Sequence, residues 1–297
     1  MRVFITGASG FIGTALIKEL HSAGHKVLGL ARSDAAAAQV AGLGAEVLRG
    51  SLADLDILKQ GATKCDGVIH LAFNHDFSKF ADNCVEDRRA IEALGDALVG
   101  SNRPLIATGG LGFLAQGRSS TEDDDQKPNE HFPRMSEPAT LAYNKKGVRA
   151  RVMRLPQVHD REKAGLITYF VQIAKEKGVS AYVGDGQNRY PAAHVDDTAK
   201  LYRLALEYNG SMTKFHAVAE EGITMKAIAE VVGQQLNLPV VSKSVEEAPA
   251  HFGWMAAFAG MDAPASSVLT QKELNWKPVG PTLMEDLAYL ERAKVAM

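Results

Sequence analysis

The glycine-rich turn Gly7-Ala-Ser-Gly10-Phe-Ile-Gly13 limits the folds open to this chain more than any other feature of its sequence. The β-rich run Val3–Thr6 directly precedes the turn and predicts a buried strand. Apolar residues at helical spacing from Phe11 to Ala23 follow the turn and predict a helix, which Gly24 ends. A strand, a glycine-rich turn and a helix in this order are typical of a phosphate-binding βαβ unit.

Each glycine of the turn has a separate task in such a unit. Gly7 permits the sharp turn out of the strand, Gly10 lets the backbone approach a pyrophosphate, and Gly13 lets the helix pack closely on the sheet. The helix then directs free N–H groups and the positive end of its dipole toward the phosphates. The turn therefore predicts a dinucleotide site, to which its other residues contribute: Ser9, Phe11 and Ile12.

Short β-rich runs alternate with helical stretches through the first half of the chain. The predicted strands are Val3–Thr6, Lys26–Ala31, Glu46–Arg49, Gly67–Ala72, Pro104–Thr108 and Val148–Leu155. The helices between them are predicted over Phe11–Ala23, Ala35–Leu43, Leu55–Gln60 and Glu86–Val99. This alternation predicts an α/β fold, a Rossmann doubly wound parallel sheet with helices on both faces. The stretch from Ala115 to Pro138 has little periodicity and predicts a long loop near the ligand.

Beyond Pro156 the pattern becomes mixed and indicates a smaller C-terminal α/β substrate lobe. The helices predicted beyond Pro156 are Ile167–Lys177, Val195–Tyr208, Thr224–Leu236 and Leu283–Ala293, and the short strands predicted there are Val179–Val183, Phe215–Val218 and Val240–Val241. We assign residues 1–155, with a return near 192–220, to the Rossmann domain, and residues 156–191 and 221–297 to the substrate lobe. Because no flexible linker separates the two, we expect them to fold against each other.

The composition is that of an ordinary soluble globular chain of 297 residues. Its formal net charge of -2 argues against a nucleic-acid or membrane-surface partner. No apolar run approaches the roughly 20 residues that a membrane-spanning helix needs. The only cysteines, Cys65 and Cys84, fit a reducing compartment. We therefore expect a cytoplasmic protein that acts on a small molecule and binds no metal.

The residues after the second predicted strand indicate which dinucleotide binds. Enzymes that use NAD usually carry an acidic residue there, which accepts a hydrogen bond from the ribose 2′-hydroxyl. This chain has Arg32-Ser33 instead. Arg32 can pair with a 2′-phosphate and Ser33 can donate a hydrogen bond to it. The sequence therefore favours NADP(H), with NAD(H) as the alternative.

Further motifs extend this pattern over nearly the whole chain: Gly50-Ser-Leu52, His70-Leu-Ala72, Arg154-Leu-Pro156, and the run from Arg189 to Asp197. Together with the glycine turn they make the chain resemble the short-chain dehydrogenase/reductase superfamily, in its extended, NAD-dependent epimerase/dehydratase-like branch. The resemblance implies cofactor contacts from Ser51, Leu52, Leu71, Ala72 and Phe73. The first two would border the adenine, and the other three the adenosine ribose and the pyrophosphate. By the same resemblance, Pro156 would lie near the nicotinamide.

The catalytic residues of that superfamily are only partly present. Its members use a Tyr-x-x-x-Lys pair, together with a Ser or Thr after the fifth strand, to move a proton at the substrate oxygen. Thr108 occupies the Ser/Thr position, beside the cofactor. The only candidate for the pair is Tyr143-Asn-Lys-Lys-Gly147, which has Gly147 at the lysine position and lies too close to the sixth strand. The chain therefore resembles the atypical members of the superfamily.

The segment 129–137, where the tyrosine is expected, contains none. In this segment His131 titrates in a range suited to proton donation, and Arg134 can stabilise an oxyanion. We therefore name Thr108, His131 and Arg134 as candidate catalytic residues. The alternatives are a solvated loop histidine, and an arginine paired with Glu137 or with the acidic run Glu122–Asp125.

These features favour an NADP(H)-dependent oxidoreductase that acts on a small carbonyl or alcohol compound. The aromatic segment His251–Phe258 can be a lid over an apolar or aromatic substrate, or plain core. Arg189 can bind a phosphate or be structural, and Asp196 and Asp197 are expected to tie the lobes together. Two other functions stay open: a non-catalytic regulator that reads the NADP(H) state, and an epimerase or dehydratase with tightly held NAD. A homodimer also stays open: dimers of the superfamily often pair through helices beside the catalytic loop, the region in which this chain departs from the pattern.

Overall fold

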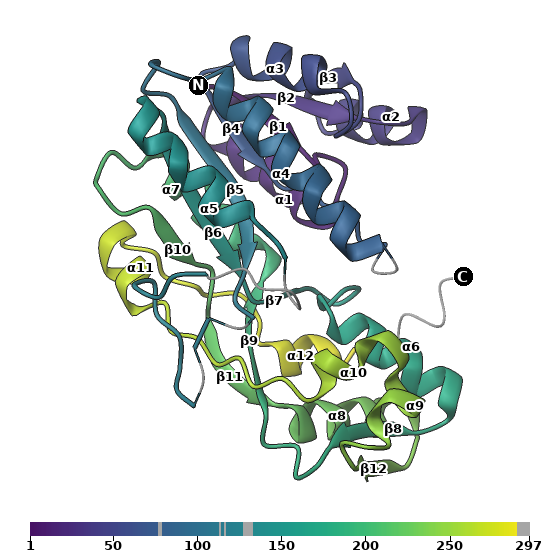
Figure 1. Ribbon diagram of the computed structural model, residues 1–297. Helices are drawn as coiled ribbons and strands as arrows, with labels where there is room; N and C mark the ends of the chain where they lie inside the picture. Colours follow the sequence, from purple (N-terminus) through teal and green to yellow (C-terminus); the bar gives the residue numbers. More distant parts are fainter. Residues whose placement is uncertain (77–78, 113, 116, 127–132, 290–297) are drawn as a thin grey trace.

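The fold is described by a computed structural model, which covers residues 1–76, 79–112, 114–115, 117–126 and 133–289. Its main element is a parallel sheet of seven strands in the order β10-β6-β5-β4-β1-β2-β3 (Figure 1). These strands are β1 Arg2–Thr6, β2 Lys26–Ala31, β3 Glu46–Arg49, β4 Gly67–His70, β5 Pro104–Gly110, β6 Arg149–Leu155 and β10 Lys214–His216. The order reverses on the two sides of β1, and open α/β sheets bind their ligands at such a reversal.

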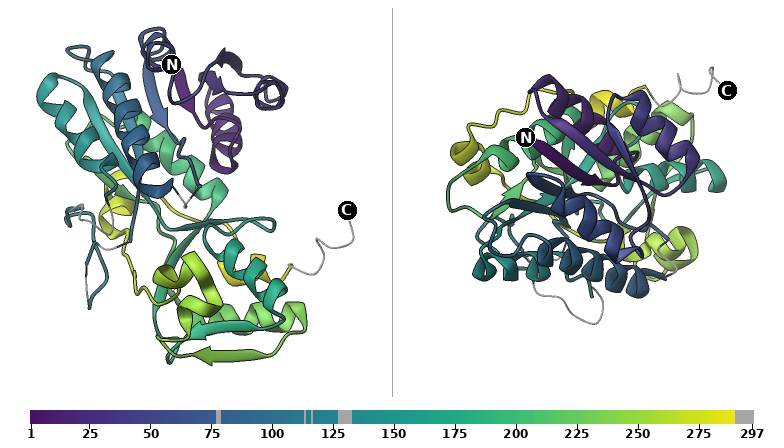
Figure 2. Two further views of the ribbon diagram at one scale, coloured as in Figure 1. Left: turned by 45° about the vertical axis from the view of Figure 1, so that its right-hand side comes forward. Right: turned by 90° about the horizontal axis from the view of Figure 1, so that it is seen from above.

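Helices cover both faces of this sheet, as Figures 1 and 2 show. On one face lie α1 Phe11–Ser22, α2 Asp34–Gly42 and α7 Val195–Glu207, whose apolar side chains share a core with Phe215 of β10. The other face carries α3 Leu55–Thr63, α4 Phe80–Asp96, α5 Ser136–Leu141 and the short 3-10 helix η2 Ala142–Lys146, with a core around Phe4 and Leu94. Because both faces are buried, the central strand β1 consists of apolar residues at Val3–Ile5, as the sequence predicts.

The second lobe lies beyond the carboxyl ends of these strands (Figure 1). A three-stranded sheet joins β7 Gln157–His159, β9 Arg189–His194 and β11 Glu220–Thr224, and a separate pair joins β8 Ser180–Val183 and β12 Val240–Lys243. Its helices are α6 Ile167–Lys177, α8 Met225–Leu236, α9 Ala248–Phe252, η3 Gly253–Met255, α10 Ala256–Ala259 and α12 Leu283–Leu287. They pack around one apolar core that contains Phe170, Tyr190 and Met255.

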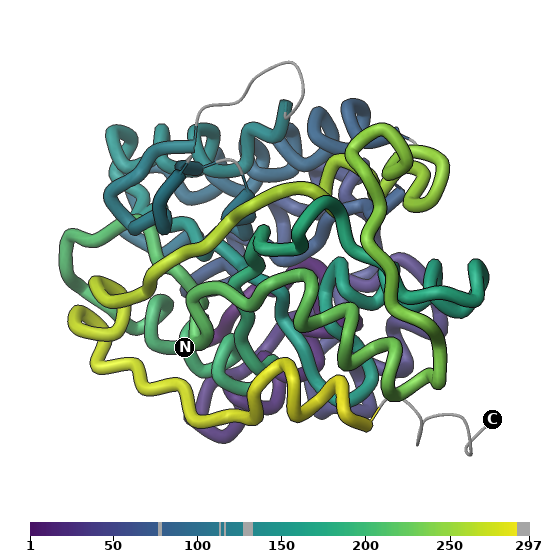
Figure 3. Tube along the Cα trace, turned by 90° about the horizontal axis from the view of Figure 1, so that it is seen from below, coloured from purple at the N-terminus to yellow at the C-terminus, as the bar shows by residue number. Residues whose placement is uncertain are grey.

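The C-terminal segment returns to the first domain before it ends in the second lobe. After α11 Val268–Leu274, the side chain of Trp276 is fully buried in the core that α1 and α7 form on the large sheet. Its indole Nε1 donates to the carbonyl oxygen of Asp197 at 3.1 Å, while the Asp197 carboxylate accepts from the N–H groups of Val279 and Gly280 at 3.0 and 2.7 Å. Figure 3 follows this segment along one side of the molecule. Asp197 thus ties α7 to the segment that leads to α12.

The regular alternation of the first half is confirmed by the structure, and the misses concern short or polar elements. Helix α4 begins at Phe80, six residues before the predicted start at Glu86, because its first turns are polar and show little periodicity. Strands β7, β9 and β11 were not predicted, and the predicted helix over Leu283–Ala293 spans Leu283–Leu287 of the described residues, which end at 289. Among the described residues, no helix combines the length and apolar character needed to cross a bilayer.

Candidate functional site

The turn between β1 and α1 has the close backbone packing that a dinucleotide site requires. Gly7 has a positive φ of 71°, and a Cβ placed on it would lie 2.8 Å from the backbone nitrogen of Ala72. A Cβ on Gly13 would lie 2.2 Å from the carbonyl oxygen of Gly7, so no larger residue fits without moving α1. Gly10, the N-cap residue, is exposed, and no side chain caps α1. The first N–H groups of α1 are therefore open to an anion, and the turn fits the pyrophosphate of NAD(P).

The segment after β4 forms the wall beside this turn, as the resemblance implies. The backbone N–H of Ala72 donates to Thr6 Oγ1 at 3.3 Å, which fixes Leu71 and Ala72 against the end of β1. Phe73 follows, and its ring lies 4.2 Å from the guanidinium carbon of Arg134. Pro156 lies directly after β6, partly exposed at the carboxyl end of the same sheet. The structure thus brings these candidate cofactor contacts to one edge of the sheet.

The segment at the end of β3 is held by a local hydrogen-bond pair. Both the N–H and the hydroxyl of Ser51 donate to Asp54 Oδ2, at 2.7 and 2.8 Å. These two hydrogen bonds lower the pKa of Asp54 below its usual range. Leu52 packs against the sheet core beside α3. The loop that would border the adenine is therefore fixed by its own side chains.

A second cation that the sequence analysis missed lies beside Arg32 and Ser33. Ser33 Oγ accepts from the N–H of Ala36 at 3.2 Å and so caps α2, while Arg49 donates to the Ser33 carbonyl oxygen and pairs with Asp34 at 2.8 Å. Within the described ranges, the exposed side chain of Arg32 has no hydrogen-bond or ion-pair partner. Arg49 ends β3 opposite Ala31, the last residue of β2. The parallel pairing of these strands, which residue spacing alone does not reveal, brings Arg32 and Arg49 to neighbouring strand ends at one corner of the sheet.

Thr108 of β5 directs its hydroxyl into the domain core. Thr108 Oγ1 donates to the carbonyl oxygen of His70 at 2.8 Å and is 2.7 Å from the hydroxyl of Tyr202 on α7. A threonine hydroxyl has one proton, so in this arrangement it has none to offer a substrate. The catalytic role of Thr108 stays a prediction. What Thr108 contributes to the site is its backbone carbonyl oxygen, which accepts a hydrogen bond from Arg134 Nη2 at 3.0 Å.

A buried polar chain links the glycine turn to Arg134. His70 contacts Thr6 Oγ1 through Nδ1 at 2.7 Å and Asp87 Oδ1 through Nε2 at 3.1 Å. The hydroxyl of Ser136 donates to Asp87 Oδ2 at 2.5 Å. Burial alone would raise the pKa of Asp87, but the hydrogen bond from His70 and the nearby charge of Arg134 lower it below its usual value. Asp87 is therefore a buried carboxylate held in its ionised form.

Arg134 is oriented by contacts with four residues. Its Nε donates to Ser136 Oγ at 2.8 Å and lies 4.0 Å from Asp87 Oδ2, Nη2 holds the carbonyl oxygen of Thr108, and the Phe73 ring packs on its face. For Nη1 the structure gives no partner among the described residues. Both N–H groups of Nη1 are therefore left for a ligand at the end of β5. The sequence signal for Asp87 is a carboxylate at a buried position of a helix whose other inward residues, apart from Asn83, are small or apolar.

The remaining sequence candidates have other environments. His131 lies outside the described residues. The hydroxyl of Tyr143 lies 2.8 Å from the carbonyl oxygen of Glu92 and 2.7 Å from Asp96 Oδ1, two acceptors for its one proton, so this tyrosine fastens η2 to α4. Arg189 makes a two-point ion pair with Asp262, at 3.0 and 2.8 Å, which favours its structural alternative over phosphate binding.

Glu137 pairs with Arg154, not with Arg134 as the sequence alternative supposed. The fully buried guanidinium of Arg154 donates to both carboxylate oxygens of Glu137, at 2.7 and 2.6 Å. It also donates to the carbonyl oxygens of Thr121 and Asp124, at 3.4 and 2.5 Å. Arg154 thereby fastens the acidic loop to the end of β6, because it satisfies backbone groups that burial would otherwise leave unpaired.

The aromatic segment of the second lobe divides between core and surface. Phe252 and Met255 are buried in the lobe's core, whereas the Trp254 side chain is 47% exposed. The Trp254 ring packs edge-on against Tyr169 of α6 and Phe258 of α10, with centroids 5.1 and 6.2 Å apart. The segment is thus partly core, as the simpler alternative held, with an aromatic group at its surface.

Comparison with known proteins extends these observations. Residues 3–218 match the NAD dependent epimerase/dehydratase family. The uncharacterized protein C2A9.02 of Schizosaccharomyces pombe is 46% identical over 290 residues, which cover 97% of this chain and 98% of that protein. The 4-hydroxy-2-methyl-3-oxo-4-farnesyl-3,4-dihydroquinoline-1-oxide ketoreductase of Stigmatella aurantiaca is 24% identical over 285 residues, 89% of this chain and 84% of its own.

Solved structures share the architecture at low sequence identity. The double mutant of DesIV, a dTDP-glucose 4,6-dehydratase from Streptomyces venezuelae crystallised with NAD and DAU bound, aligns with a TM-score of 0.75 at 20% identity. The alignment covers 100% of this chain and 97% of that one. The resemblance inferred from the motifs is therefore confirmed, as is the Rossmann fold. Since the family match spans most of the sequence and the glycine turn fits the dinucleotide pyrophosphate, this chain belongs to the NAD-dependent epimerase/dehydratase family, with its NAD(P)-dependent oxidoreductase-like fold.

Proposed function

We propose that this protein is an NADPH-dependent reductase of a small carbonyl compound with an apolar or aromatic body, and that Arg134 binds the carbonyl oxygen. The observation that carries the proposal is the guanidinium of Arg134, held at the end of β5 by Thr108 and Ser136 with Nη1 left for a ligand. A bound reduced nicotinamide supplies a hydride. The task left to the chain is to orient the carbonyl and stabilise the charge that develops on its oxygen.

The buried carboxylate of Asp87 supports this assignment of Arg134. Through Ser136 it fixes the direction of the guanidinium, and its negative charge offsets the cost of holding a cation that is largely removed from water. Arg134 cannot supply the proton, because a guanidinium stays charged in proteins. We assign the proton to solvent or to His131. The aromatic group around Trp254 is our proposed contact for the substrate body, and the ketoreductase relative is named for a 3-oxo compound built on a farnesylated dihydroquinoline.

The test is a panel of aromatic and aliphatic aldehydes and ketones, with NADPH consumption as the readout. Arg134→Ala is expected to lower kcat/KM by about 10²–10³-fold, the usual loss for one oxyanion donor, with the Kd for NADPH unchanged. Arg118→Ala is the control, because Arg118 is an exposed arginine paired with Asp124. Unchanged turnover in Arg134→Ala would remove Arg134 from the site. No turnover with any carbonyl, together with capture of a protein partner that depends on the redox state, would instead favour the regulator.

The preference for NADPH rests on Arg32 and Arg49. Arg32→Ala is expected to weaken NADPH binding about tenfold, the equivalent of one charge-assisted contact, and to leave NADH binding unchanged. Fluorescence titration of both cofactors measures this. Equal affinity of the wild-type protein for NADH and NADPH would refute the preference while leaving the reductase proposal intact.

A further inference from the structure

A lysine of the second lobe lies beside the glycine turn of the first domain. The Nζ of Lys163 is 5.6 Å from the ring centroid of Phe11, within the range of a cation–π contact. Phe11 is the first residue of α1 and follows Gly10 directly, so its own N–H is among the groups that face the pyrophosphate. Lys163 belongs to the loop between β7 and α6, which is far from this turn in the sequence.

The loop that carries Lys163 is held by its own hydrogen bonds. Asp160 Oδ1 accepts from the N–H groups of Glu162 and Lys163, both at 2.8 Å, and the N–H of Asp160 donates to the carbonyl oxygen of Lys163 at 2.8 Å. A β-bridge between His159 and Ala164 closes the loop at its base. Because the backbone of the loop is fixed, Lys163 is presented from a defined position.

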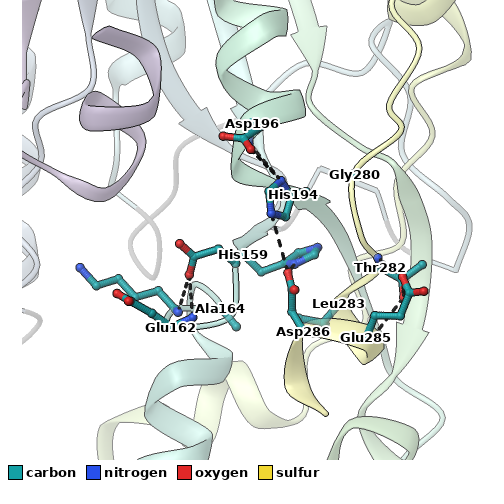
Figure 4. Close-up of polar contacts among 12 residues, drawn as sticks. His159, Glu162, Ala164, His194, Asp196, Gly280, Thr282, Leu283, Glu285 and Asp286 are labelled. Carbon is teal, nitrogen blue, oxygen red and sulfur yellow. Dashed lines mark hydrogen bonds and ion pairs between the residues drawn. The ribbon is translucent and has the colours of Figure 1, made fainter. Parts of the chain in front are cut away.

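The base of the loop is anchored in the interior of the second lobe, as Figure 4 shows. The fully buried His159 contacts Asp286 of α12 through Nδ1 at 2.7 Å, and its ring packs edge-on against His194 at 5.8 Å between centroids. Arg161, two residues before Lys163, stacks on Tyr289 at 4.1 Å. Arg161 therefore packs on its own lobe, whereas Lys163 extends toward the first domain.

The charges around Lys163 favour an anion beside it. The first turn of α1 contains no acidic residue, and no carboxylate in the described part of the chain pairs with the exposed ammonium of Lys163. The positive end of the α1 dipole adds to the same field. The Lys163 ammonium and the positive end of α1 repel each other, and an anion bound between them would offset this repulsion.

We infer that Lys163 is a pyrophosphate-binding residue, which the second lobe adds to the dinucleotide site of the first domain. The inference rests on the dinucleotide binding of the proposed function, and it concerns the phosphates common to NADH and NADPH. It gives the second lobe a part in cofactor binding as well as in substrate binding. The ammonium acts as a mobile point charge on a flexible stem, which suits a phosphate that enters between two lobes.

The test compares Lys163→Gln, Lys163→Arg and Arg161→Gln by fluorescence titration with NADPH and with NADH. Lys163→Gln is expected to weaken both cofactors about tenfold and by the same factor, while Lys163→Arg stays near the wild type. Arg161→Gln removes the same charge from the same loop and is expected to leave both affinities unchanged. In about 1 M salt, where the Debye length is about 3 Å, the difference between Lys163→Gln and wild type is expected to shrink.

The outcomes separate this inference from the proposed function. If Lys163→Gln binds both cofactors as tightly as the wild type, or loses NADPH alone, the inference is overturned and the reductase proposal stands. If the wild-type protein binds neither cofactor, both are overturned. A loss of both cofactors by the same factor supports Lys163, whatever the substrate panel shows, because binding is measured without turnover. Thermal unfolding of each variant verifies that the fold is intact.

Discussion

At the scale of single residues, the carbonyl oxygen of Gly7 leaves no space for a side chain on Gly13. We expect Gly13→Ala to lower the free energy of unfolding by about 2 kcal/mol, a usual cost of overpacking, and to abolish tight cofactor binding because α1 must shift. Thermal unfolding and NADPH titration measure the two effects. The matched control is Gly42→Ala on α2, where a new Cβ meets no atom within 4 Å. A Gly13→Ala protein as stable as Gly42→Ala would contradict the packing that we describe.

His216 predicts how stability responds to acid. Its Nδ1 is 2.7 Å from the carbonyl oxygen of Ser266 and its Nε2 is 3.0 Å from Arg154 Nη1, so the folded protein holds the ring neutral. Burial, together with the charge of Arg154, lowers the pKa of His216 to about 3. This folded-state pKa lies below the unfolded value of about 6.5, so between them the unfolded chain binds more protons. The contribution of His216 is therefore complete above pH 6.5 and is lost as the pH falls toward 3.

The measurement is the urea midpoint at several pH values for wild type and His216→Asn. Wild type is expected to lose up to about 1.4 kcal/mol per pH unit through this one group, and the variant to have a shallower slope. Other buried histidines, such as His159, also titrate, so the difference between the two proteins is the quantity to compare. Parallel slopes would mean that His216 titrates as an ordinary histidine.

At the scale of elements, the ion pair of Arg154 and Glu137 joins β6 to α5 and to the acidic loop. Arg154→Met leaves the Glu137 carboxylate buried without its counter-ion, so we expect a loss of about 3–5 kcal/mol in the free energy of unfolding. Arg154→Met/Glu137→Leu should recover part of this loss, since both charges are then gone. The exposed pair of Arg118 and Asp124 is the control, and Arg118→Ala is expected to cost less than about 1 kcal/mol. Denaturant unfolding would contradict the assignment if the single and double variants were equally destabilised.

The elements also show what the sequence can and cannot predict. The glycine turn and the strands of the first domain follow from periodicity and glycine spacing, because these patterns are local. The direction of the Thr108 hydroxyl is set by Tyr202 on α7, which is 94 residues away. The partner of Glu137 lies on strand β6, and the position of Arg49 beside the end of β2 depends on strand register. Such pairings arise from tertiary packing, so local pattern predicts the elements of the site but not its polar contacts.

At the scale of the whole molecule, the two tryptophans have opposite environments and predict opposite effects. Trp276 is fully buried in the core of the first domain, whereas Trp254 is about half exposed at the surface of the second lobe. We expect Trp276→Ala to cost about 3–5 kcal/mol, as for other buried tryptophans, and to lower the stability of both lobes together. Trp254→Ala is expected to change stability by about 1 kcal/mol or less. Calorimetry would contradict this coupling if Trp276→Ala split unfolding into two separate transitions.

The position of Trp276 also has a consequence for synthesis on the ribosome. Every strand in the described part of the chain has been made by Lys243, yet the core between α1 and α7 lacks its indole until residue 276 emerges. A nascent chain therefore exposes apolar surface of its first domain for most of translation, and we expect it to depend on chaperones over that interval. The domain that is synthesised first is thus among the last parts of this protein to become complete.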